Sequence, residues 1–162
     1  MQLNGLILTL PKQIKRLLGA FVITLSIGFY TGLLFVGETT TANPNGIEEQ
    51  YLGNESDENA EVMRFKKNDK EMLTLVHNHI LSMSIIFFLL GAIVSITKLD
   101  KKLKLFLMIE PFFSVVLTFG GLYLLWTGII WMKYIVMLSG ILMTIVFTVS
   151  VFVILKQLLE KS

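Results

Sequence analysis

The chain has 162 residues, of which 54% are apolar and only 16% are charged, and its mean hydropathy is +0.71. In soluble domains about a quarter of all residues are charged, so the composition indicates an integral membrane protein with no room for a soluble catalytic domain. The net charge is only +2 and cysteine is absent, which excludes disulfides, cysteine-ligated zinc, iron–sulfur clusters and covalently attached c-type haem.

An amphipathic lead-in over residues 1–16 opens the chain, and we expect it to lie along the membrane surface, broken at Pro11. Residues 17–36 follow without a charge and form a first span, since about 20 apolar residues cross a bilayer. This run is too long for the apolar region of a signal peptide, so we expect it to be retained. Its Gly28 and Gly32 form a GxxxG pattern. We favour packing within the bundle over a dimer face for this pair.

Residues 37–72 form the one extended polar segment, with nine acidic residues against four basic ones and hence a net charge of −5. Residues 47–52 favour a helical turn or two. The acids lack the spacing of an EF-hand loop. We therefore interpret the segment as a solvated outer loop rather than a calcium site.

Three further spans are predicted from apolar runs of sufficient length. These spans are residues 73–97, 105–125 and 134–155. The segments outside them are a lysine-rich turn at residues 98–104, a turn with two tryptophans at 126–133 and a tail at 156–162. The sequence therefore predicts a single all-α membrane domain, built as a four-helix transmembrane bundle.

The orientation follows from the two short connections, where the positive-inside rule is most dependable. Four lysines lie in residues 98–104 and one in residues 126–133. We therefore expect both termini in the cytoplasm and the acidic loop outside, in the periplasm or extracellular space. Four aromatic side chains then form an outer interfacial belt. They are Tyr123, Trp126, Trp131 and Tyr134.

Both histidines of the chain, His77 and His79, lie where the polar loop gives way to the second span. At about 100° per residue, Met72, His79 and Met83 share one narrow stripe of a helix, whereas His77 points more than about 100° away. The two imidazoles therefore cannot chelate one ion while the helix is regular. The stripe itself suggests a soft Cu(I) site, although methionine also fills gaps in apolar cores.

Haem b is a second candidate cofactor for the histidines. Its axial ligands come from opposite sides of the ring, so a bis-histidine haem needs a second subunit. Pairing His79 or His77 with Met132 or Met137 of the fourth span gives histidine–methionine ligation within one chain. The structural alternative is that the imidazoles cap the helix or bond loop carbonyls, and a quinone or another small ligand is a further one.

Glu110, directly before Pro111, is the one acidic residue within the predicted spans. It follows Lys104 by six residues, which places it roughly 9 Å further along a helix. A carboxylate there is costly unless it is paired, protonated or hydrated, so it is a functional hypothesis by default. It acts either as a proton relay or ligand, or as a structural glutamate, protonated or paired with Lys102 or Lys104. Five hydroxyls can donate a hydrogen bond to Glu110 or to the carbonyl that Pro111 frees. They belong to Ser95, Thr97, Ser114, Thr144 and Thr148.

Patterns of stand-alone catalysis are missing: the sequence has no Ser–His–Asp arrangement, no HExxH, no phosphate loop and no basic nucleic-acid surface. Gly140, Thr144 and Thr148 form a ridge of small residues that favours helix packing. We interpret the chain as a non-catalytic subunit. Its expected partners are the lipid bilayer and other membrane or periplasmic subunits, or a second copy, and no nucleic acid.

Several motifs between about residues 40 and 125 carry a family resemblance. They are Gly46-Ile47-Glu48-Glu49, Tyr51, Gly53-Asn54, Met63-Arg64-Phe65-Lys66-Lys67, Glu71-Met72-Leu73, His77-Asn78-His79 and Glu110-Pro111. In these motifs the chain resembles a group of small bacterial four-span inner-membrane proteins with a His-x-His at the start of the second span. That group is assumed to be respiratory or cytochrome-associated, and the resemblance implies that His77, His79 and Glu110 are family features.

From these observations we expect an accessory or electron-transfer subunit of a respiratory-type complex in the bacterial inner membrane. Haem b, held near the outer surface by His79 or His77, is its candidate cofactor. A copper-handling membrane protein that uses Met72, His79 and Met83 is one alternative. A structural assembly subunit without a cofactor is the other.

Overall fold

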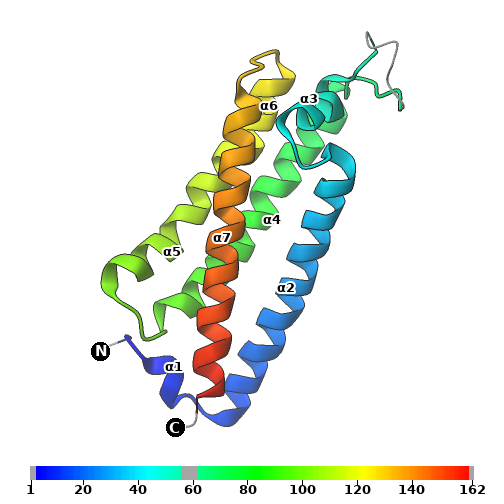
Figure 1. The fold of residues 1–162 in the computed structure, drawn as a ribbon. Helices are drawn as coiled ribbons and strands as arrows, with labels where there is room; N and C mark the ends of the chain where they lie inside the picture. The colour runs from blue at the N-terminus through cyan, green and yellow to red at the C-terminus, as the bar shows by residue number, and fades with distance from the viewer. Residues whose placement is uncertain (1–2, 56–61, 161–162) are drawn as a thin grey trace.

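Four membrane-length helices dominate the computed structural model, which describes residues 3–55 and 62–160 (Figure 1). Within that part of the chain, four helical segments are long and apolar enough to cross a bilayer, and no strand occurs. They are α2 (Lys12–Thr40), α4 (Asp69–Ser95), the continuous rod of α5 (Lys101–Val115), η1 (Val116–Gly120) and α6 (Gly121–Trp126), and α7 (Met132–Leu159). The predicted all-α bundle of four spans is confirmed.

Helix α7 lies at the centre of the bundle and packs against α5, η1, α6, α4 and α2 (Figure 1). Aromatic rings fill the junction of α2, α4 and α7. Phe29 of α2 stacks on Phe147 of α7 with ring centroids 3.8 Å apart, and Phe87 of α4 meets both rings edge-on. Beyond this contact α2 is largely exposed, so it lies at the edge of the bundle.

The GxxxG pair of α2 does not contact the rest of the described chain. Gly28 and Gly32 are exposed, and a Cβ added at either position would meet nothing within 4 Å. The expectation that this pair packs within the bundle is therefore wrong. Tyr30, between the two glycines, makes the contact instead, because its hydroxyl lies 2.9 Å from the Thr148 hydroxyl of α7.

Both termini lie at one end of the bundle, which we call the basic end (Figure 1). Here the short helix α1 (Leu6–Thr9) lies against the residues that directly follow α4. Gly5 N donates to Thr97 O at 3.2 Å, and Ile7 N donates to Ile96 O at 3.0 Å. Because Ile7 is fully buried there, the lead-in is part of the fold. At Pro11 it turns into α2.

Two side chains close the basic end. The Lys104 ammonium donates to Ser95 O at 3.0 Å, to Thr97 O at 2.6 Å and to Asn4 Oδ1 at 2.7 Å, so it caps the carbonyl end of α4. Gln157 of α7 forms a paired contact with the backbone of Lys98, accepting from its N–H at 2.7 Å and donating to its carbonyl at 3.0 Å. Lysine at a helix C-terminus also complements the helix dipole.

Local capping signals set where the helices begin. Asn68 and Glu71 form a capping box, in which each side chain accepts from the other residue's backbone N–H, at 2.9 and 3.0 Å. This exchange satisfies two of the free amides at a helix start. Helix α4 therefore begins at Asp69, four residues before the predicted span. Asp100 similarly accepts from two amides and starts α5 at Lys101, inside the turn expected at residues 98–104.

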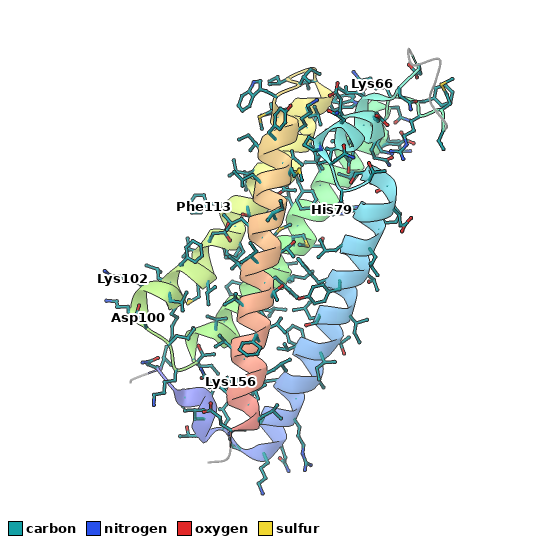
Figure 2. The ribbon with its side chains drawn as sticks, in the orientation of Figure 1. Lys66, His79, Asp100, Lys102, Phe113 and Lys156 are labelled. Carbon is teal, nitrogen blue, oxygen red and sulfur yellow. The ribbon has the colours of Figure 1, made fainter. Side chains whose placement is uncertain are left out.

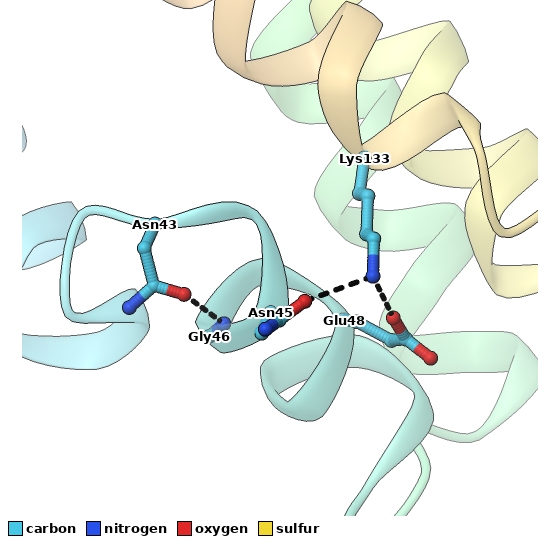
Figure 3. Close-up of polar contacts among 5 residues, drawn as sticks. All are labelled: Asn43, Asn45, Gly46, Glu48 and Lys133. Atoms are coloured by element: carbon cyan, nitrogen blue, oxygen red, sulfur yellow. Dashed lines mark hydrogen bonds and ion pairs between the residues drawn. The ribbon is translucent and has the colours of Figure 1, made fainter.

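The opposite end, which we call the cap end, is covered by helix α3 (Pro44–Leu52) (Figure 1). Asn43 starts this helix by accepting from Gly46 N at 2.8 Å (Figure 3). Lys133, at the start of α7, then holds α3 down through Glu48 Oε2 at 2.7 Å and Asn45 Oδ1 at 2.9 Å (Figure 3). Much of the segment expected as a polar loop is thus an ordered cap.

The chain that follows α3 is also fixed to the cap. Gly53 adopts φ +83°, in the left-handed region that suits glycine, and a Cβ there would lie 2.7 Å from Lys66 N. Asn54 N donates to Arg64 O at 3.0 Å, and Arg64 N donates back to Asn54 Oδ1 at 2.7 Å. The Trp126 indole donates to Lys67 O at 2.8 Å. Residues that carry the family resemblance therefore build the cap.

Candidate functional site

His79 is exposed on α4 near the cap end, and one of its ring nitrogens has no partner among the described residues (Figure 2). Its Nδ1 lies 2.8 Å from Leu75 O, one turn earlier, and its ring stacks on Phe119 with centroids 4.7 Å apart. A carbonyl only accepts, so Nδ1 carries the hydrogen and Nε2 keeps its lone pair in the neutral ring. This is the arrangement in which a histidine binds a metal through Nε2 while a backbone carbonyl fixes its tautomer.

The other histidine lies apart from this arrangement. His77 is exposed, and its ring makes no hydrogen bond to a residue that the structure describes. The helix is regular through this stretch, so His77 and His79 point in different directions, as their spacing predicts. Only the ring of His79 is held in place by its surroundings.

The methionines expected as ligands lie in other environments. Met72 is fully buried, whereas His79 on the same predicted stripe is exposed and Met83 is half-buried. Met132 is 6% exposed and packs against Gly121, where an added Cβ would lie 3.2 Å from its terminal methyl. In the described residues, no cluster of three or more histidine and acidic side chains is placed to hold a metal ion.

An open groove runs along α4 beside His79. It has a volume of about 420 Å³. Its lining residues are Lys70, Glu71, Thr74, Leu75, Asn78 and His79. These residues supply both charges together with amide, hydroxyl and imidazole groups, while most of the exposed surface of the groove is apolar.

Glu110 lies deep in the bundle, at 9% exposure, on the inward face of α5. Its Oε1 accepts a hydrogen bond from Ser114, the one residue of five candidate hydroxyls that the structure brings to it. Its Oε2 is buried and has no hydrogen-bond partner among the described residues. An unpaired charge at the centre of a span costs at least about 2.5 kcal/mol.

Neither lysine expected as a partner pairs with Glu110. Lys104 is committed to the carbonyl end of α4 and to Asn4. Lys102 is exposed at the basic end, where Figure 2 shows it pointing away from the bundle beside Asp100. The alternative of a glutamate paired with either lysine is therefore wrong for the described structure.

The helix around Glu110 is irregular on both sides of Ser114. Pro111 lacks an N–H and leaves the carbonyl of Leu107 without its usual donor, and the wider π-helical turn η1 follows at Val116. Such π turns occur frequently at functional sites. Within η1, the buried Thr118 hydroxyl lies 2.8 Å from the Ser139 hydroxyl of α7.

Thr118 and Ser139 were not among the residues that the sequence pointed to. A serine or threonine in an apolar run usually bonds to its own helix, as Ser139 also does to Ile135 O at 2.8 Å. A hydroxyl has one hydrogen to donate, so Thr118 is the donor in the pair. The only available signal was the four-residue spacing of Glu110, Ser114 and Thr118.

Comparison with known proteins identifies a family for the chain and gives no information about its ligands or its reaction. Searches of curated proteins and of solved structures found no match. A family model, Aq_1264_TM, described as a transmembrane helical domain, matches residues 41–162. The match includes the cap, α4, the α5–α6 rod and α7, which is about three quarters of the chain. The chain therefore belongs to this family of transmembrane helical domains.

Proposed function

We propose that this protein is an accessory or electron-transfer subunit of a respiratory-type complex in the bacterial inner membrane. One observation carries the proposal: the exposed His79 ring is held by Leu75 and Phe119, and its Nε2 has no partner among the described residues. A subunit that offers a fixed ligand on its outer face supplies it to a neighbouring chain. The sequence contains none of the catalytic motifs considered above.

Haem b is the cofactor that we propose for this position. The chain has no histidine outside the start of α4, and Met132 is packed in the core. His79 of this chain would hold the haem together with a residue of a partner subunit, and the haem would supply electron transfer. A copper site formed by Met72, His79 and Met83 has less support, because Met72 is fully buried and His79 is exposed.

The orientation is part of the proposal. The lysines of residues 98–104 lie at the basic end, together with both termini (Figure 1). By the positive-inside rule this end faces the cytoplasm. The cap and His79 then lie toward the periplasm, near the aromatic side chains of the α6–α7 turn. Lys66, labelled at the cap end in Figure 2, lies over the Trp126 ring at 5.1 Å.

The test is an absorption spectrum of the tagged protein, purified from its native membrane in mild detergent together with whatever remains bound. We expect a Soret band that is lost in His79→Ala and kept in His77→Ala, the matched control two residues away. Loss of the band in both variants, or in neither, refutes the assignment of His79. Elemental analysis for copper on the same samples tests the alternative ligand set.

A cofactor-free assembly subunit is the second candidate, and the ordered cap favours it. Three polar side chains near the cap end bond to residues of the cap and not to a ligand. They are Lys133, Arg64 and Trp126. A colourless, copper-free sample that still contains a stoichiometric partner chain supports this function and overturns the haem assignment. A sample that contains only a second copy of this chain indicates a homodimer.

A further inference from the structure

We propose that Glu110 is a proton-binding site in the interior of the membrane, independent of His79 and of any cofactor. The carboxyl takes up and releases one proton, Ser114 holds it in place, and the Thr118–Ser139 pair extends the polar path toward the cap end. Oε2 is the atom at which the proton is exchanged. This proposal rests on the burial of the carboxyl, its single partner and the hydroxyls beyond it.

Among the described residues, no charged group balances this carboxyl. Helices α4 and α7 and the π turn η1 pack against α5, and residues 80–97, 116–120 and 135–155 of these neighbours contain no charged or titratable side chain. On α5 itself, Lys101 and Lys102 are exposed at the basic end, and Lys104 is bonded elsewhere. An ionised carboxyl at this position would have no counter-charge among the described residues.

Ser114 differs from most of the hydroxyl side chains in the described spans. Eight serine and threonine side chains donate to the backbone carbonyl four residues earlier. They are Ser26, Thr31, Thr39, Thr40, Ser82, Ser139, Thr144 and Thr148. Ser114 instead donates to the side chain of Glu110. Its hydroxyl is therefore committed to positioning the carboxyl, which a purely structural serine does not require.

The polar residues continue along one buried face. Glu110, Ser114 and Thr118 are spaced four residues apart, so they rise about 12 Å along the helix axis. In a regular α-helix this spacing drifts by about 40° per step, and the wider π turn at Val116–Gly120 reduces the drift. Thr118 consequently still faces the core, where it donates to Ser139. The π turn thus keeps the hydroxyls in line with the carboxyl.

The test is covalent labelling of the full-length protein in phospholipid vesicles with dicyclohexylcarbodiimide, an apolar reagent. A protonated carboxyl adds its hydrogen to one nitrogen and its oxygen to the central carbon of the carbodiimide, and the adduct rearranges to a stable N-acylurea that mass spectrometry locates. We expect labelling at Glu110, falling about tenfold for each pH unit above its midpoint. Glu110→Gln should remove the label and leave the helical circular dichroism unchanged.

Two comparisons separate protonation from accessibility. A water-soluble carbodiimide should label exposed acids such as Glu49 and Glu71 and leave Glu110 untouched. Ser114→Ala should shift the pH midpoint of Glu110 labelling, whereas Ser82→Ala, which removes a hydroxyl bonded only to backbone, should not. Infrared spectra should show a protonated carboxyl stretch that titrates with pH and is missing in Glu110→Gln.

Three outcomes would overturn the proposal. If Glu110 is not labelled at any pH, the carboxyl either stays ionised or is inaccessible to the reagent. Labelling that is independent of pH means a permanently neutral, structural acid. A midpoint that is the same in Ser114→Ala and in the wild-type protein removes the positioning role of the serine.

Discussion

Gly46 offers a direct test of whether the segment after α2 is an ordered cap. In the structure, a Cβ added at this position would lie 1.9 Å from Thr40 O and 2.6 Å from the Thr40 carbonyl carbon. Both are backbone atoms at the end of α2, so no side chain can rotate away. Relief requires α3 to move by more than about 1 Å. Gly46→Ala should therefore release α3 from the helix that it covers.

The magnitude follows from the kind of clash. Overpacking costs about 1–3 kcal/mol when side chains and backbone can shift, and a backbone clash this close belongs at the upper end. A loss of about 3 kcal/mol corresponds to a change of roughly two orders of magnitude in an opening equilibrium. Amide hydrogen exchange of α3 should accelerate by about that factor, while α7 keeps its protection.

Gly37→Ala is the matched control, because a Cβ at Gly37 meets nothing within 4 Å. This substitution lies near the end of α2, where alanine favours a helix by about 0.5–1 kcal/mol relative to glycine, so exchange in the cap should stay the same or slow slightly. If Gly46→Ala and Gly37→Ala give the same exchange rates in α3, the packing of the cap described above is wrong.

Three further predictions concern the cap and the start of α4. Glu48→Gln removes the charge that Lys133 contacts and should raise α3 exchange only about fivefold, since partly exposed ion pairs contribute about 1 kcal/mol or less; Glu49→Gln, on the exposed side, should have no effect. Asn68→Ala breaks the capping box and should cost about 1 kcal/mol, seen as faster exchange confined to the first turn of α4; uniform exchange along α4 would contradict this. Burial raises the pKa of Tyr51 above 10.0. The contribution of the neutral phenol to cap stability is therefore complete below pH 10.0 and is lost as the pH rises through the raised pKa. Alkaline titrations followed by circular dichroism should show this loss, and Tyr51→Phe should lessen it.

The number of spans and the helical class were readable from the sequence alone. Lipid offers no hydrogen bonds, so each apolar run of about 20 residues satisfies its own backbone as a helix. The helix starts at Asn43, Asn68 and Asp100 were also present as local capping signals. Our predicted boundaries missed them because they follow the apolar runs, whereas the first turn of each capped helix is polar.

Only the tertiary structure decided which polar groups meet, because their partners are distant in sequence. Lys133 and Glu48 are 85 positions apart, and Trp126 and Lys67 are 59 apart. No local pattern encodes such pairs, so a segment that is polar and acidic was expected to be a loop. The spacing in the sequence separated His77 from His79, and the fold then fixed only His79. The sequence likewise singled out Glu110 as costly, but only the packed bundle shows that its lysines bind elsewhere and that one of its oxygens has no partner among the described residues.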